Sequence, residues 1–167
     1  MGWSSTPNDL SVDESGKSGD IDAIPAPEKG DTMEIQPKKP SAKGPTEWFT
    51  GDVWIDAIAQ GREPSRIRVS AVHFTPGART AWHSHALGQT LYVTEGAGLV
   101  QSRGGDIAAI RSGDIVYTPA DEWHWHGATP DDVMTHLSMA EGVPGGQGPE
   151  TDWGAHVTDA EYRGEQQ

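Results

Sequence analysis

The chain has 167 residues and a mass of 17.9 kDa, a size that suits one ordinary domain. It contains no cysteine, which excludes disulfide scaffolds, thiolate nucleophiles and cysteine-based metal sites. The formal net charge of −13 argues against a nucleic-acid partner, and no apolar run approaches the roughly 18 residues that a membrane span needs.

Residues 1–43 differ in composition from the rest of the chain. They are rich in Ser, Pro, Gly, Asp and Lys, and every lysine of the protein precedes residue 44. Such a segment buries too little apolar surface to offset the entropy lost on ordering. We therefore expect a disordered N-terminal tail over residues 1–43 and one folded domain over residues 44–167. The tail has neither the basic start nor the apolar centre of a secretory signal, which favours a cytoplasmic location.

From about Trp48 onward, short runs of β-forming residues alternate with Gly, Pro and Asp. In chain order, the expected strands are Val53–Ala59, Arg66–Phe74, Thr90–Thr94, Gly98–Ser102, Asp106–Ile110, Asp114–Thr118, Trp123–His126 and Val133–Ser138. Short strands spaced by roughly 8–12 residues are typical of an all-β sandwich or barrel. The last segment, Thr151–Arg163, is expected to form a turn or a short helix.

Four of the seven histidines form two close pairs, His83 with His85 and His124 with His126. On a strand, residues two apart point to the same face, so each pair places two imidazoles side by side. Imidazole is the commonest metal ligand at neutral pH. Gln89 follows His85 by four residues, near the start of an apolar run. The pairs therefore indicate a metal site built on strands.

The surrounding sequence resembles the two signature motifs of the cupin superfamily. The first motif reads Gly77-x5-His83-x-His85-x3-Gln89-x6-Gly96, and the second reads Gly113-x5-Pro119-x-Asp121-x2-His124. The resemblance implies a double-stranded β-helix, the jelly-roll barrel, with one divalent metal ion per chain. The implied ligands are His83, His85, Gln89 and His124, and ligand type alone does not choose among Mn, Fe, Co, Ni and Zn.

The glutamine is a departure from the family pattern, because most cupins have glutamate at the position of Gln89. A neutral amide leaves the +2 charge of an ion uncompensated, so the ion should be a better Lewis acid and harder to oxidise. This difference favours polarisation of a hydroxyl or carbonyl group over oxygen chemistry.

Longer stretches are similar to small bacterial cupins that include manganese-dependent hydroxynitrile lyases. The similarity runs from about Lys43 to Tyr162 and includes Gly77–Gly96 and Trp123–Ala128. It implies manganese as the favoured ion and a lyase that cleaves cyanohydrins into a carbonyl compound and HCN. It also implies a homo-oligomer, a dimer or tetramer, because small cupins commonly associate through their outer strands. Two alternatives stay open: a metal-dependent oxygenase, and a non-catalytic module that binds or senses a small molecule.

The same resemblance gives His126 and His136 the role of moving protons during catalysis. Strand alternation independently places His126 on the metal-facing side if His124 is there, whereas the direction of His136 is not fixed by its sequence. By the same alternation, Ser70, Val72 and Phe74 are candidate walls of the substrate pocket. His73 is expected on the outer face, and three tryptophans should point away from the metal: Trp82, Trp123 and Trp125.

Overall fold

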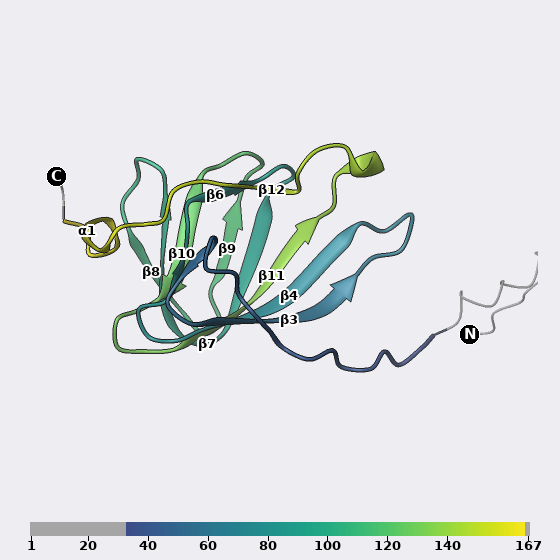
Figure 1. Cartoon of the computed structure of the whole chain (residues 1–167), viewed down its shortest axis with the longest axis horizontal. Coiled ribbons are helices and arrows are strands. Elements are labelled where there is room, and N and C mark those ends of the chain that lie inside the picture. Colours follow the sequence, from purple (N-terminus) through teal and green to yellow (C-terminus); the bar gives the residue numbers. More distant parts are fainter. Residues whose placement is uncertain (1–32, 166–167) are drawn as a thin grey trace, which may run out of the picture. The chain divides into compact units, whose positions relative to one another are not determined.

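The computed structural model describes residues 33–165, and from Pro37 onward these belong to one unit built almost entirely of strands (Figure 1). The strands are β1 (Ala42–Lys43), β2 (Phe49–Thr50), β3 (Val53–Gln60), β4 (Ile67–Phe74), β5 (Arg79–Thr80), β6 (His83–His85), β7 (Gln89–Ser102), β8 (Ala108–Arg111), β9 (Ile115–Thr118), β10 (His124–Ala128), β11 (Met134–Glu141) and β12 (Thr151–Trp153). A 3₁₀ turn, η1 (Pro144–Gly146), and one helical turn, α1 (Asp159–Tyr162), complete the elements.

All strand pairs are antiparallel, in the order β1-β3-β4-β11-β7-β10-β5-β2, with β6, β8, β9 and β12 attached beside this path. The 14-residue strand β7 belongs to both faces, because its first half pairs with β9 and β11 and its second half with β8 and β10. The sheet therefore curls around an interior, as predicted for a jelly-roll barrel.

Strand β7 replaces the two separate strands that the sequence predicted over Thr90–Thr94 and Gly98–Ser102. The predicted break falls at Gly96, where φ is +77°. Near this point the pairing with β11 shifts register between Thr135 and His136. A glycine and a bulge bend the strand without ending it, so one strand can cross between the two faces.

The barrel encloses one apolar cluster and carries a second one outside it. The inner cluster lies between the faces and contains Phe49, Val53, Val72, Phe74, Ala78, Val93, Ile110, Ala128 and Met134. The outer cluster contains Trp82, Trp125, Val157 and Tyr162, with Trp123 packed against it. The tryptophans beside the histidines thus point away from the barrel interior, as strand alternation predicted.

Both ends of the predicted domain differ from expectation. Ala42 and Lys43 pair with β3, so the sheet begins two residues before the predicted boundary at residue 44. The rest of the predicted disorder falls mainly on residues 1–32, which lie outside the described residues. At the other end, Thr151–Arg163 contains not only the helical turn α1 but also β12, which pairs with β6. No helix within residues 33–165 is long and apolar enough to cross a membrane.

Candidate metal centre

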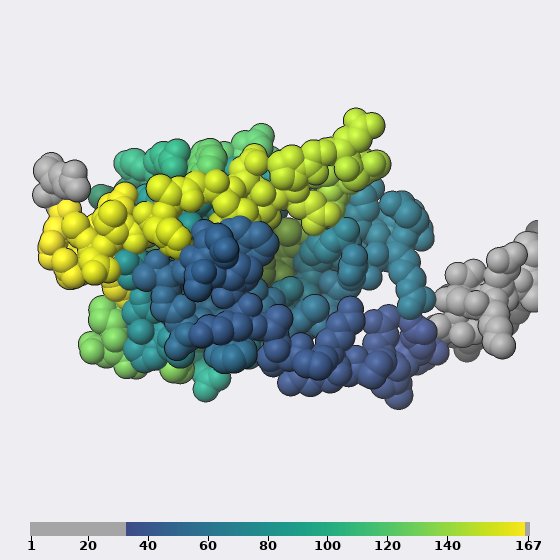
Figure 2. Space-filling model, viewed as in Figure 1, coloured from purple at the N-terminus to yellow at the C-terminus, as the bar shows by residue number. Residues whose placement is uncertain are grey.

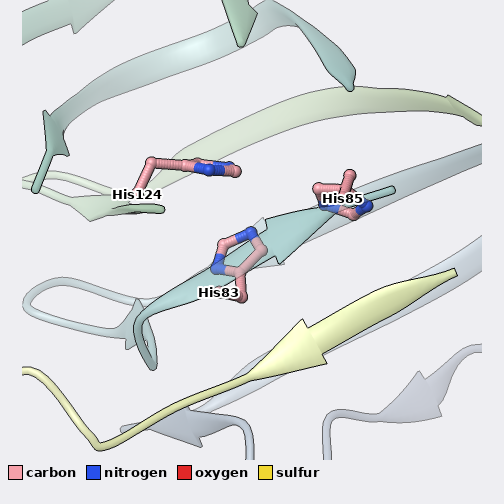
Figure 3. Close-up of side chains that lie close together, drawn as sticks. All are labelled: His83, His85 and His124. Atoms are coloured by element: carbon pink, nitrogen blue, oxygen red, sulfur yellow. The ribbon is translucent and has the colours of Figure 1, made fainter. Parts of the chain in front are cut away.

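Three histidines from two neighbouring strands face one another inside the barrel. His83 and His85 extend from the same face of β6, and His124 faces them from β10, where it pairs with His83 (Figure 3). One ring nitrogen from each residue lies within 4.8 Å of the other two. All three side chains are buried. This arrangement could hold one metal ion, because three neutral imidazoles converge on a small volume.

Hydrogen bonds to main-chain carbonyls fix the tautomer of two of the three rings. Nδ1 of His83 lies 3.0 Å from the carbonyl oxygen of Ala81, and Nδ1 of His124 lies 2.9 Å from that of Glu122. Carbonyl oxygens only accept, so both rings donate from Nδ1 and keep a lone pair on Nε2. Nδ1 of His85 lies 3.1 Å from the hydroxyl of Thr151, and its buried Nε2 has no partner. With Nδ1 of each ring occupied by a hydrogen bond, the three Nε2 atoms fit the ligand positions of a metal ion.

Gln89, at the start of β7, supplies the fourth predicted ligand. Its Oε1 lies 3.1 Å from Nε2 of His124, and its Nε2 donates to the hydroxyl of Ser138 at 2.9 Å. With Nδ1 of His124 donating, Oε1 and the ring Nε2 are both acceptors, and two facing acceptors repel each other. A cation shared by the two atoms would remove this repulsion, so the amide oxygen fits a ligand role.

Electrostatics keep the three rings in the neutral form that metal binding requires. Burial lowers the pKa of His83 well below its ordinary value and lowers the pKa of His85 to about 4. Burial also lowers the pKa of His124, although the Glu122 carbonyl that accepts its proton opposes the shift. Neutral imidazoles do not need to release a proton before they bind an ion.

Two further buried histidines lie beside this centre in the barrel. His126 is two residues beyond His124 on β10, and its ring centre lies 5.2 Å from that of His83 and 4.8 Å from that of His136 on β11. No ring nitrogen of either residue has a hydrogen-bond partner within the described residues. Burial lowers the pKa of His126 well below its ordinary value and that of His136 to about 4. The structure therefore brings both predicted proton-transfer residues to the site.

A cavity of about 160 Å³ adjoins the histidines. Of the three candidate pocket residues on β4, Ser70 and Val72 line this cavity, whereas Phe74 does not. Phe74 instead packs near two histidine rings, with centroid distances of 5.9 Å to His126 and 5.5 Å to His136. Val72 and Phe74 both belong to the inner apolar cluster, and Phe74 packs against the histidine rings instead of lining the cavity.

The sequence did not reveal several other residues that line the cavity: Phe49, Ile55, Thr80, Ser138 and Trp153. Ile55 and Ser138 lie in predicted strands, and strand alternation alone could have suggested them. Phe49 and Trp153 come from strands of two and three residues, which carry no readable periodicity. The two remaining histidines lie elsewhere: His73 on the outer face beside Asp56 and Thr135, and His156 at the surface beside Thr50.

Comparisons with known proteins agree with this geometry. Residues 70–139 match the family model described as a cupin domain. Over 123 residues the chain is 50% identical to "(R)-mandelonitrile lyase" of Granulicella tundricola, which covers 74% of this chain and 92% of that protein. A crystal structure of a cupin-like protein from Thermotoga maritima is 38% identical, covers 80% of this chain and 97% of its own, and superposes with a TM-score of 0.68.

A more distant structure, a cupin-2 domain from Rhodospirillum rubrum, shares 17% identity and superposes with a TM-score of 0.57 over 78% of this chain and 82% of its own. That likeness concerns the fold alone. The mandelonitrile lyase, by contrast, is similar in sequence over 123 residues, which is nearly the length of the whole domain. The chain belongs to the cupin superfamily, among the small cupins that resemble hydroxynitrile lyases.

Proposed function

We propose that this protein is a metal-dependent lyase that reversibly cleaves cyanohydrins, such as mandelonitrile, into a carbonyl compound and HCN. The observation that carries the proposal is the placement of two buried, unpartnered histidines next to a three-histidine centre and a small cavity. The 50% identity to a mandelonitrile lyase supports the same reaction class. Manganese is the ion we favour, held by His83, His85, His124 and Gln89.

A divalent ion in this centre would supply Lewis-acid stabilisation for the negative charge that develops on the hydroxyl oxygen of a cyanohydrin. Gln89 contributes to this effect because its amide oxygen carries no formal charge. A glutamate at this position would neutralise part of the positive charge. The amide therefore favours polarisation of a substrate oxygen.

His126 and His136 would move the protons. Both rings are neutral near pH 7, because burial lowers their pKa values, and each has a free lone pair that can accept the substrate hydroxyl proton. Once protonated, a ring in this environment is a strong acid, since the same burial destabilises the charged form. It would then readily give its proton to departing cyanide.

The remaining walls would hold the organic part of the substrate and exclude water. Phe49, Ile55, Val72 and Trp153 present apolar surface, while Ser70, Thr80 and Ser138 provide hydroxyl groups. The cavity of about 160 Å³ is smaller than pockets for drug-sized ligands, which begin at roughly 300 Å³. We therefore propose a small substrate, such as a single aromatic ring that carries the cyanohydrin group.

The test is release of benzaldehyde from racemic mandelonitrile by Mn²⁺-loaded protein, measured against the spontaneous rate. We expect release that disappears in metal-free protein and in His124→Ala. His156→Ala is a matched control, because His156 is an exposed histidine that does not line the cavity, and it should keep full activity.

Two outcomes would favour the alternative functions. Turnover that requires oxygen, with loss of activity under strict anaerobiosis, would favour a metal-dependent oxygenase. A full complement of bound Mn²⁺ without turnover of cyanohydrins, carbonyl compounds or oxygen would favour a small-molecule binding or sensing module. Either result would refute the lyase assignment.

A further inference from the structure

The strand that carries two of the three histidines is short, and neighbouring strands hold it in position. Strand β6 has three residues, and β10 pairs with it only at His83. On its other edge, β12 pairs with all three residues: Thr151 with His85, Asp152 with Ser84, and Trp153 with His83. In Figure 3, the yellow strand beside His83 and His85 is β12. The C-terminal segment therefore forms one complete edge of the candidate metal centre.

Each of the three rings has one hydrogen bond at Nδ1 among the described residues, and only the bond of His85 is to a side chain, that of Thr151. His83 and His124 donate to main-chain carbonyls two residues before them, which substitution cannot remove. His85 instead lies 3.1 Å from the hydroxyl of Thr151, 66 residues away in sequence. An ion on Nε2 of His85 requires the proton on Nδ1, so Thr151 would accept that proton. The threonine hydroxyl can accept from this tautomer, so its hydrogen bond supports the ring orientation that metal binding requires.

Trp153 supports the second ring of the same strand. Its indole stacks on His83 with ring centres 4.8 Å apart and planes inclined by 27°. The same indole also stacks on Trp48, with centres 5.0 Å apart and an interplanar angle of 3°. The stack restricts rotation of His83 about its side-chain bonds. It also joins the C-terminal strand to the turn before β2.

Hydrogen bonds anchor the C-terminal segment on both sides of β12. Main-chain bonds join Ala86 to Glu150, and Trp82 to both Gly154 and Ala155. Further along, the buried guanidinium of Arg79 donates to the carbonyl oxygen of Val157 at 2.9 and 3.0 Å. Figure 2 shows this segment, in yellow, running across the visible face of the molecule beside blue N-terminal residues. These hydrogen bonds therefore determine where the C-terminal segment lies on the barrel.

We propose that β12 holds two of the metal ligands in place. Thr151 positions the ring of His85, and Trp153 positions the ring of His83. Tight metal binding therefore depends on the C-terminal segment. The inference rests on the proposed metal site. It extends beyond the matched cupin domain, because that match ends at residue 139 and β12 begins at Thr151. Thr151 and Trp153 are positioning residues, since they act through the histidine rings.

The test measures the dissociation constant for Mn²⁺ alone, from the electron paramagnetic resonance signal of the free ion. Thr151→Val keeps the shape of the side chain but removes the acceptor, and we expect Mn²⁺ to bind about 10- to 100-fold more weakly. Thr151→Ser restores a hydroxyl and should recover most of the affinity. Thr94→Val is the matched control, because Thr94 is exposed and its hydroxyl donates to the main-chain carbonyl of Thr135 and not to a ring of the three-histidine centre.

Trp153→Leu and Trp153→Phe form a second pair of variants. Leucine removes the aromatic stack and should weaken Mn²⁺ binding, whereas phenylalanine keeps a ring and should retain more of the affinity. Thermal unfolding of the metal-free variants checks that each one folds. For Thr151, a protein that folds like the wild type but binds Mn²⁺ weakly, with rescue by serine, is the expected result.

The wild-type titration separates failure of this inference from failure of the metal site itself. Wild-type protein that binds no Mn²⁺ would overturn both. Wild-type protein that binds one ion per chain, together with an unchanged dissociation constant in Thr151→Val and Trp153→Leu, would overturn the role of β12 alone.

Discussion

Lowering the pH should destabilise the metal-free protein, and His136 should account for a definable share of the loss. Its side chain is fully buried, and burial lowers its pKa from 6.5 to about 4. Between these values the unfolded chain binds a proton that the folded chain does not, so the free energy of unfolding falls as the pH falls. Each unit of pKa difference corresponds to about 1.4 kcal/mol. Between pH 7 and pH 5, His136 alone should lower stability by about 2 kcal/mol.

The assay compares urea unfolding of metal-free wild type and His136→Gln at both pH values. Glutamine changes stability at every pH, but it cannot titrate, so only the difference between pH 7 and pH 5 is used. We expect this difference to be about 2 kcal/mol smaller in the variant than in the wild type. His156→Gln, at the exposed C-terminal histidine, should behave like the wild type. An equal loss in wild type and His136→Gln would refute the reasoning, since it would mean that His136 takes up a proton without cost in the folded state.

Three further predictions follow from other parts of the structure. Gly96→Ala should destabilise the protein by several kcal/mol more than Gly104→Ala, which should cost roughly 1–2 kcal/mol. Both glycines have φ near +80°, but a Cβ at Gly96 would lie 1.8 Å from the carbonyl oxygen of Val133, whereas a Cβ at Gly104 would meet no atom within 4 Å. Equal midpoints of urea unfolding for the two variants would contradict this difference in stability. We expect a dimer or tetramer to form through the outer face of β7 and β9. On this face Tyr92, Ile115 and Tyr117 are exposed by 40%, 70% and 72%. Sedimentation velocity should show an oligomer for wild type and a monomer for Ile115→Lys combined with Tyr117→Lys, and a wild-type monomer at micromolar concentration would refute this. Gln89→Glu should bind Mn²⁺ more tightly yet release benzaldehyde more slowly, because the carboxylate neutralises part of the ion's charge; faster release would contradict the proposed role of the amide.

The placement of the histidines in the candidate metal centre was largely predictable because its signal is local. His83 with His85 and His124 with His126 are each two residues apart on one strand, and alternation alone places each pair on a common face. The spacing of the glycines and histidines then indicated the barrel that brings the two pairs together. The direction of His136 was not predictable, because apolar and polar residues do not alternate regularly along β11 and so do not indicate which of its faces is buried.

The C-terminal contribution to the site was missed for a different reason. Strand β12 has three residues, and the chain from Thr151 to Arg163 has no sustained period that would identify a strand. Its position is determined by pairing with β6, across 66 residues of sequence between Thr151 and His85. Similarly, the domain boundary at residue 44 was too late by the two residues of β1, whose pairing with β3 depends on tertiary structure.

The most direct test of the account is anomalous diffraction from crystals of Mn²⁺-loaded protein grown with benzaldehyde. We predict one anomalous peak among the Nε2 atoms of His83, His85 and His124 and the Oε1 atom of Gln89. The aldehyde oxygen should face that ion, within reach of His126 or His136. An ion bound elsewhere, or an aldehyde bound away from these two histidines, would contradict the proposed metal-dependent lyase.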